Sequence, residues 1–330
     1  MSVRLSLLTL LVAPALMAQT PTIRGTLIVT NKTPATATII DVASGRTLAT
    51  LPTGNGPHEV VVSRDGGTAI VTDYGAAGPG GTTLTVIDLP TLAVARTISL
   101  GEYRRPHGIA FLPGDSVVAV TSETNRAVLL VHVASGTIRK VIATEQNGSH
   151  MVGVTADGSR GYTGNIGSNT VSELDLRSGT SLRRFDVPAQ PEAINVTPDG
   201  REVWVGSNAT GKVSAIDVAT GAVTTAAEGL SWPYRVLFTP DASLVLLPDY
   251  RGETLRFVQR ATRQELGRLS LAGAGPQGIV LTSDARYAFL SLSVQARVAI
   301  IDVARREVVG HLAAGQTPDG VAFTSRVVAR

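Results

Sequence analysis

The chain has 330 residues, of which 43% are hydrophobic, 17% charged and 4% aromatic, and it contains no cysteine. The lack of cysteine excludes a disulfide scaffold, a thiolate metal site and a cysteine nucleophile. The formal net charge is +3, and the basic residues form no long run, so nothing indicates a nucleic-acid partner.

The first 18 residues are typical of a secretory signal peptide. Arg4 is followed by an apolar stretch up to Ala18, which is shorter than the roughly 20 residues that a helix needs to cross a bilayer. We expect cleavage after Ala18, a mature chain of residues 19–330 that forms one domain, and no membrane span after cleavage. The expected location is periplasmic or secreted, and the expected state is a monomer. A membrane anchor that is never cut is the alternative.

A turn of the form Gly/Gln-x-Pro-x recurs through the rest of the chain. Its positions are Pro57, Pro106, Pro191, Pro233, Pro276 and Pro318, with Ser149 in the one place where the proline is missing. The successive spacings are 49, 43, 42, 42, 43 and 42, and a glycine-rich insertion at residues 76–82 explains the first, longer one. The spacing predicts seven structural repeats.

Each repeat contains four short segments with the features of β-strands. The copy that starts at Pro191 runs PEAINVTPDG, REVWVGSNATG, KVSAIDVATG and AVTTAAEG. Apolar and polar residues alternate within these segments, and Gly, Asn and Asp bound them, which is the signal of strands joined by tight turns. The repeat is therefore predicted to be a four-stranded sheet.

The two ends of the chain predict how the ring of repeats closes. The first copy begins with TLIVTNK, which is the second strand of the other copies, and the chain ends with an additional first strand, PDGVAFTSRVV. We expect the strand at 320–325 to complete the blade that begins with residues 26–53, because this removes the exposed sheet edges. The predicted fold is an all-β, seven-bladed β-propeller of four-stranded blades.

These segments resemble a known repeat family. The recurring PDG, the strands that end in VTN or VTD, and the runs NTVSELDLRSG and KVSAIDVATG are similar to the YVTN or YncE-like seven-bladed propellers, over about residues 25–325. The family is related in pattern to the propeller lactonases. The resemblance is specific for the fold and weakly informative about function, because the repeats encode blades rather than chemistry.

The position just after the turn proline carries the strongest functional signal. In ring order its occupants are His58, His107, His150, Glu192, Tyr234, Gln277 and Asp319. The chain has five histidines, and three of them occupy this position on consecutive blades. In a propeller this position opens onto one mouth of the central channel, so the three imidazoles are expected to meet there.

The bends between second and third strands should rim the same mouth. They contribute Asp73, Tyr74, Ser122, Glu123, Asn165, Asn208, Asp249, Tyr250 and Arg251. Arg105 and Arg235 stand beside His107 and Tyr234 in the sequence and would add positive charge there.

The histidines allow two interpretations. Neutral imidazoles with one or two carboxylates are ligands of Zn, Mn, Fe, Ni or Cu, so His58, His107, His150 and Glu192 form a candidate site for one divalent metal ion. The sequence does not choose among these metals. The alternative is structural, since a histidine at such a turn can bond to the backbone or to the turn of a neighbouring blade.

Two classes of function follow. The first is an exported enzyme that acts on a small anionic substrate, with His150 and Glu192 in acid–base roles and Arg105 or Arg235 holding a carboxylate. The resemblance to propeller lactonases and metal-dependent propeller lyases implies lactone hydrolysis or β-elimination. The second is a non-catalytic propeller that binds a ligand or a cell-envelope protein. YncE-like relatives also imply DNA binding, which the lack of a basic stripe disfavours.

Overall fold

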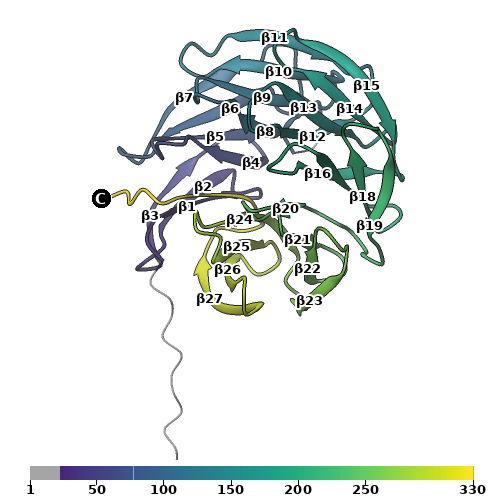
Figure 1. Ribbon diagram of the computed structural model, residues 1–330. Helices are drawn as coiled ribbons and strands as arrows, with labels where there is room; N and C mark the ends of the chain where they lie inside the picture. Colours follow the sequence, from purple (N-terminus) through teal and green to yellow (C-terminus); the bar gives the residue numbers. More distant parts are fainter. Residues whose placement is uncertain (1–22, 77, 330) are drawn as a thin grey trace, which may run out of the picture.

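The structure is a computed structural model that describes residues 23–76 and 78–329. These residues form seven four-stranded antiparallel sheets arranged as the blades of a ring, which confirms the predicted seven-bladed propeller (Figure 1). None of the described residues belongs to a helix, so no helix among them could cross a membrane. The predicted signal peptide, residues 1–18, and the expected new N-terminus at Gln19 lie outside the described residues.

The seven blades share one strand order from the channel outward. The innermost strands are β28 (Pro318–Thr324), β4 (Pro57–Val62), β8 (Pro106–Phe111), β12 (Ser149–Val154), β16 (Pro191–Val196), β20 (Leu237–Phe238) and β24 (Pro276–Leu281). The second strands are β1 (Thr26–Asn31), β5 (Thr68–Asp73), β9 (Val117–Ser122), β13 (Arg160–Asn165), β17 (Glu202–Ser207), β21 (Leu244–Asp249) and β25 (Tyr287–Leu292). The third strands are β2 (Thr36–Asp41), β6 (Thr83–Asp88), β10 (Ala127–His132), β14 (Thr170–Asp175), β18 (Lys212–Asp217), β22 (Thr254–Gln259) and β26 (Arg297–Asp302). The outer strands are β3 (Arg46–Pro52), β7 (Ala93–Ser99), β11 (Ile138–Ala143), β15 (Thr180–Asp186), β19 (Val223–Ala227), β23 (Glu265–Ser270) and β27 (Glu307–Ala313).

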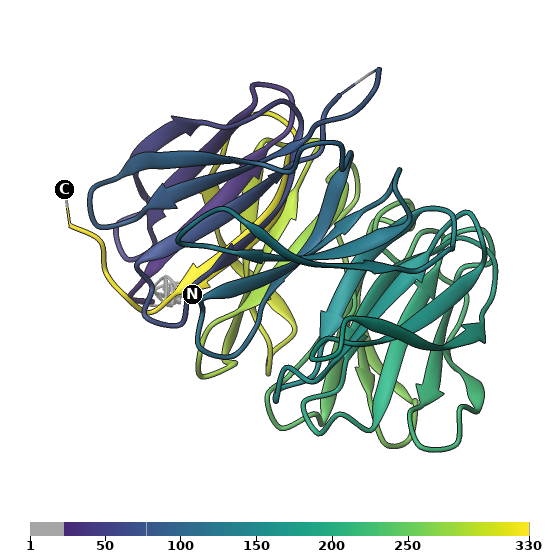
Figure 2. The ribbon, with the colours of Figure 1, turned by 90° about the horizontal axis from the view of Figure 1, so that it is seen from above.

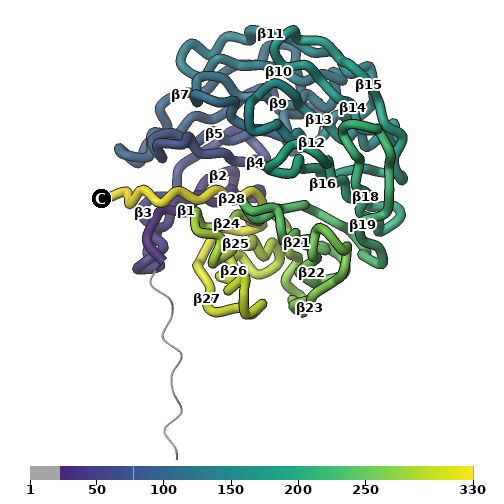
Figure 3. Tube along the Cα trace, viewed as in Figure 1, coloured from purple at the N-terminus to yellow at the C-terminus, as the bar shows by residue number. Residues whose placement is uncertain are grey.

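The two ends of the chain complete one blade together. Strand β28 pairs antiparallel with β1, and Thr26 lies opposite Thr324. Figure 3 shows this contact between the yellow C-terminal segment and the purple N-terminal blade, and Figure 2 shows it from a perpendicular direction. The predicted closure of the ring is confirmed, with the closing strand two residues longer at its start than the sequence indicated.

Burial explains why these segments form strands at these places. Each second strand lies within its blade and between two other blades, so β1 is buried along its whole length. Outer strands such as β7 alternate between exposed and half-buried residues because one face meets water. Apolar clusters fill the space between neighbouring blades, for example Ile28 with Val71 between the first two. Each fully buried Ile or Val contributes about 1.5–3 kcal/mol.

The innermost strands share an irregularity that bears on the site. In six blades the pairing of the innermost strand with the second strand shifts register after the first residue, as between Pro57 and Val60. In the blade of β20 the chain makes only an isolated bridge at Pro233 before the short strand begins. Such bulges change the direction in which side chains point, and here they lie at the position that carries the histidines.

Candidate functional site

Seven residues, one from each blade, meet at the proline end of the channel. We call them the channel layer: His58, His107, His150, Glu192, Tyr234, Gln277 and Asp319. All are buried except His58, which is half-buried, and His107 and Asp319 are 1% and 0% exposed. The layer therefore closes this end of the channel, where the sequence predicted an open mouth.

The three histidines of the layer contact one another in blade order. The ring centroids of His107 and His150 are 3.7 Å apart with an interplanar angle of 32°, and those of His58 and His107 are 4.7 Å apart. Tyr74 packs against His58 and His107 at 4.5 and 5.2 Å. The prediction that consecutive blades bring these imidazoles together is thus realised in the structure.

A carboxylate stands at each end of this row of imidazoles. The Nδ1 atom of His58 is 3.3 Å from Oδ2 of Asp319, and the Nδ1 atom of His150 is 3.7 Å from Oε1 of Glu123. Tyr74 donates a hydrogen bond of 2.6 Å to Oε2 of the same Glu123. Tyr234 donates one of 3.0 Å to Asp319, so both carboxylates are held in place.

Burial controls the charge of the row. It lowers the pKa of His58 to about 3, and the nearby negative charge of Asp319 offsets this only in part. Burial also lowers the pKa of His107 well below its ordinary value, and the neighbouring histidines add to the effect. Burial acts to raise the pKa of Asp319, but Lys32, at 3.2 Å, and the other nearby cations outweigh it and hold that pKa below its usual range. The rings of His58 and His107 are therefore neutral beside an ionised carboxylate at pH 7.

Within the described part of the chain, the Nδ1 atoms of the imidazoles make no hydrogen bond, although two of them lie near a carboxylate. The Nδ1 atoms of His58, His107 and His150 are all buried and make no hydrogen bond with any described residue. Buried polar atoms in folded proteins nearly always have a partner, whether protein, water or ligand. Two of these Nδ1 atoms still face carboxylates, so the unpartnered nitrogen of His107 is the one that indicates a further polar group.

Glu192 has different surroundings from the histidines. Its carboxylate accepts a hydrogen bond of 3.0 Å from the indole nitrogen of Trp232 and another from Asn208. Arg251 lies 4.1 Å above the Trp232 ring, and Tyr250 packs against the edge of that ring. No hydrogen bond or ion pair among the described residues joins Glu192 to the histidines, so the structure does not assemble the four-residue set that the sequence suggested.

Arg235 lies below the layer and is buried. It is 8% exposed, donates a hydrogen bond of 2.6 Å to the backbone carbonyl of Tyr234, and forms an ion pair with Glu59. We call this ion pair, which crosses the channel from blade six to blade two, the channel bridge. Burial raises the pKa of Glu59 although Arg235 acts against it. The expectation of an exposed Arg235 that is free to hold an anion is wrong, because its charge is already paired.

Arg105 lies at the outer side of the histidines. Its guanidinium group is 4.9 Å from the centroid of the Tyr74 ring and donates a hydrogen bond of 3.1 Å to the carbonyl oxygen of Gly78. Gly78 belongs to the glycine-rich insertion, which thus reaches back over the site. Of the two predicted arginines, only Arg105 stays half-exposed on the layer's solvent side.

The polar residues that end the second strands are structural and do not rim a mouth as predicted. Four of them are almost completely buried: Asp73, Ser122, Asn165 and Asp249. Asp73, for example, accepts a hydrogen bond of 3.0 Å from the backbone N–H of Gly54 and so anchors the turn that leads into β4. Only the next residues along the bends, such as Tyr74 and Glu123, reach the histidines.

The side chains do not form a ready metal site. Among residues 23–76 and 78–329, no three His, Asp or Glu side chains are arranged so that they could hold one metal ion together. A metal ion would need the imidazoles to turn away from their stacked arrangement. The donor chemistry suits a transition metal, because neutral imidazole is the form of histidine that binds one.

The channel bridge was missed at the sequence level, although the repeats contain a signal for it. The bridge residues come directly after the histidine position, where the seven blades carry Glu59, Gly108, Met151, Ala193, Arg235, Gly278 and Gly320. Only two of these residues are charged, and their charges are opposite. Two lone opposite charges facing the same channel are expected to pair, because each is costly to bury alone.

Comparisons with known proteins bear on the fold. No protein-family model matches the chain, and no curated protein matches it. A solved structure titled hydrazine synthase of Kuenenia stuttgartiensis is similar, with a TM-score of 0.75, 16% identity, and coverage of 90% of this chain and 99% of that one. A protein of unknown function from Desulfotomaculum acetoxidans has a TM-score of 0.74 and 14% identity, covering 91% of this chain and 98% of its own. At these identities the likeness extends to the fold alone: this chain is a seven-bladed β-propeller.

Proposed function

We propose that this chain is a YVTN or YncE-like propeller whose channel layer binds one divalent transition-metal ion. The observation that carries the proposal is the row of three contacting imidazoles with a carboxylate beside Nδ1 at each end. Two of the three rings have a lowered pKa, which keeps them in the neutral form that binds metals.

The proposed ligands are His58, His107 and His150. In metal sites the second ring nitrogen of a ligating histidine usually faces a carboxylate or carbonyl, which fixes the ring. Asp319 and Glu123 stand in that relation to Nδ1 of the two outer histidines, at 3.3 and 3.7 Å, so these two rings would bind the metal ion through Nε2. They replace Glu192 as the carboxylates of the proposed site.

A bound divalent ion would supply Lewis-acid chemistry, so the reaction types that we propose are hydrolysis of a small ester or lactone and β-elimination. Within the chain, Tyr74, Glu123 and His150 form a continuous series of polar groups along which a proton could be held or passed. Arg105 is the cation placed to meet a small anionic substrate from outside. This chemistry therefore indicates a class of substrate, a small anionic molecule.

A second candidate is a non-catalytic propeller that binds a ligand or a cell-envelope protein. It is favoured by the tight closure of the channel layer, which leaves His107 1% exposed, and by the lack of an assembled metal-ligand set among the described residues. In this case the stacked histidines would have a structural role, and the rim with Trp232 and Arg251 would be the outward surface.

We further propose that the protein is exported and works as a monomer in the periplasm or outside the cell. The support for export is the signal-peptide pattern of residues 1–18. N-terminal sequencing of the protein from cell fractions would test this. An uncut Met1 in the membrane fraction would contradict it.

Metal binding is tested directly by elemental analysis of the protein purified without added metal, followed by thermal melting with Zn, Mn, Fe, Ni or Cu. A metal that binds only the folded state stabilises it by about 2.7 kcal/mol when its free concentration is 100 times the Kd. We expect this gain in the wild type and in His311→Ala, whose histidine lies on outer strand β27, and not in His107→Ala. A metal-free wild type that responds to none of these ions would favour the non-catalytic candidate.

A further inference from the structure

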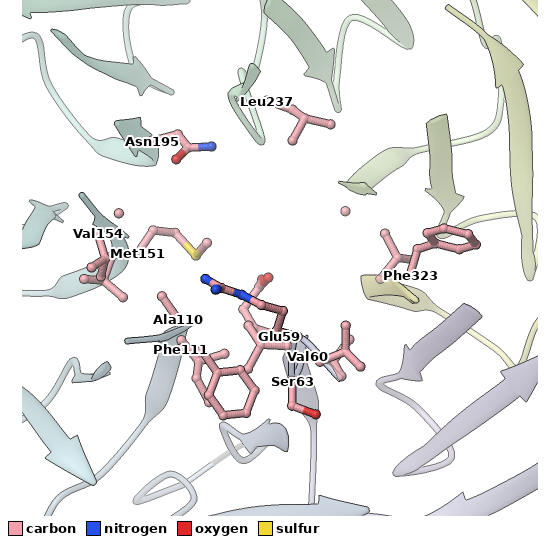
Figure 4. Close-up of a pocket in the computed structure, with 18 of the residues that line it drawn as sticks. Glu59, Val60, Ser63, Ala110, Phe111, Met151, Val154, Asn195, Leu237 and Phe323 are labelled. Carbon is pink, nitrogen blue, oxygen red and sulfur yellow. The ribbon is translucent and has the colours of Figure 1, made fainter. Parts of the chain in front are cut away.

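The channel contains a second space, on the far side of the channel bridge from the histidines. This cavity has a volume of about 720 Å³ and is lined by the innermost strands of the blades. Figure 4 shows its labelled side chains standing around an open centre, with Phe111, Met151, Leu237 and Phe323 on different sides. A volume of this size is typical of sites for small organic ligands.

Apolar residues are the more numerous in the wall of the cavity, but the surface that faces the cavity is more polar than apolar. Its lining includes Val60, Val62, Ala110, Phe111, Met151, Val154, Ile194, Leu237, Ile279 and Phe323. A wall of this mixed character fits a ligand with both apolar and polar parts, because apolar groups gain by leaving water and polar groups need hydrogen-bond partners.

A pair of charged groups lies at the inner end of the cavity. There the channel bridge forms the floor, with Glu59 and Arg235 both in the lining. A guanidinium group has five N–H donors, and Arg235 uses one for the carbonyl oxygen of Tyr234 and one for Glu59. The remaining three have no hydrogen-bond partner among the described residues, so the floor offers donors to a ligand.

The charges of the lining decide which ligand fits. They are two acidic and two basic residues, namely Glu59 with Arg235 at the floor and Asp115 with Arg64 near the outer end. The floor charges neutralise each other as an ion pair, so an ionic ligand would have to compete with a partner that is already in place. A neutral ligand meets no such competition.

We propose that this cavity is a binding site for an uncharged small molecule that has apolar parts and a hydrogen-bond acceptor, such as a carbonyl oxygen, that receives an N–H of Arg235. The site is separate from the channel layer and does not depend on metal binding there. The channel bridge forms the floor of this cavity and lies between the cavity and the channel layer.

Nile red is a suitable probe, because it is neutral, apolar, fluorescent and carries one carbonyl acceptor. Titration of the wild type should give saturable binding of one dye per chain. Diphenylhexatriene, which is apolar but has no acceptor, should bind about tenfold more weakly, the value of one hydrogen bond to a charged group. The anionic dye anilinonaphthalene sulfonate should also bind more weakly than Nile red.

Filling the cavity should remove the site. Ala110 on β8 lines the cavity, so Ala110→Val, Ala110→Leu and Ala110→Phe should lower the affinity for Nile red in that order, with at least a tenfold loss at Phe. Ala134→Phe, in an exposed turn of the same blade, is the matched control and should bind like the wild type. Circular dichroism checks the fold of each variant. If the Phe variant unfolds, the Val and Leu variants still test whether the affinity for Nile red falls as the side chain grows.

Three results would overturn the proposal. The first is the lack of saturable Nile red binding to the wild type. The second is equal affinity across the Ala110 series, which would place the dye elsewhere. The third is equal or tighter binding of diphenylhexatriene or of the anionic dye, which would exclude the neutral acceptor-bearing ligand.

Discussion

Replacing Arg235 by methionine should destabilise the fold strongly, because it leaves a buried carboxylate without its partner. The side chains of Arg235 and Glu59 are 9% and 13% exposed, so neither charge is solvated well when alone. Breaking one side of a buried ion pair costs about 3–5 kcal/mol. Methionine keeps most of the apolar stem, so lost packing adds little.

The matched control is an arginine in an exposed ion pair. Arg305 is 62% exposed and lies 2.7 Å from Glu307, so Arg305→Met should cost less than about 1 kcal/mol. The double variant Glu59→Leu, Arg235→Met removes both buried charges. It should recover most of the lost stability, since a well-packed apolar pair often equals or exceeds a buried ion pair.

The assay is urea unfolding of the wild type, the two single variants and the double variant at pH 7, with thermal melting as a second measure. For a large domain, a loss of 3–5 kcal/mol corresponds to a decrease in Tm of about 10 °C. The reasoning is refuted if Arg235→Met is as stable as Arg305→Met, or if the double variant is no more stable than Arg235→Met.

Three further predictions concern the fold around the site. A chain that ends at Thr317 lacks β28 and should melt well below the full mature chain; an equal Tm would contradict the closure of the ring. Gly278→Ala should destabilise far more than Gly101→Ala, because a Cβ at 278 would lie 2.2 Å from the backbone oxygen of Asp319, whereas the space at 101 is open; equal loss in urea unfolding would refute this. Burial raises the pKa of Asp73 to about 6, although hydrogen bonds act to lower it, so the wild type should lose up to about 3 kcal/mol as the pH rises from about 4 to 6. Asp73→Asn cannot titrate and should lack this loss, and parallel pH profiles of the two proteins would show the attribution to be wrong.

The fold could be predicted from the sequence because each blade corresponds to one sequence repeat of nearly constant length. A proline turn every 42 or 43 residues specifies one blade at a time, and strand patterns are local. The closure by β28 could be predicted for the same reason, since the first repeat lacks a strand that the last segment supplies. Blade six does not follow the strand pattern of the other blades. Its innermost strand has only two residues, and Asp249 accepts hydrogen bonds from the backbone N–H groups of Ser231 and Trp232.

The site could be predicted only to the level of a position in the repeat. The sequence placed three histidines in one row, and the structure brings them into contact. It could not show that Glu192 has Trp232 and Asn208 as partners, because these contacts depend on side-chain packing between blades. Nor could spacing alone show that Glu59 pairs with Arg235 across 176 residues of sequence.

The closing strand also has a consequence for the order of events in folding. Thr26 pairs with Thr324, so the first blade lacks its innermost strand until residues 318–324 have been synthesised. Contacts between residues so distant in sequence slow folding, because the loop between them must be ordered before the contact forms. Blades two to seven use only local strands and can form during synthesis, whereas the ring can close only after β28 has been synthesised.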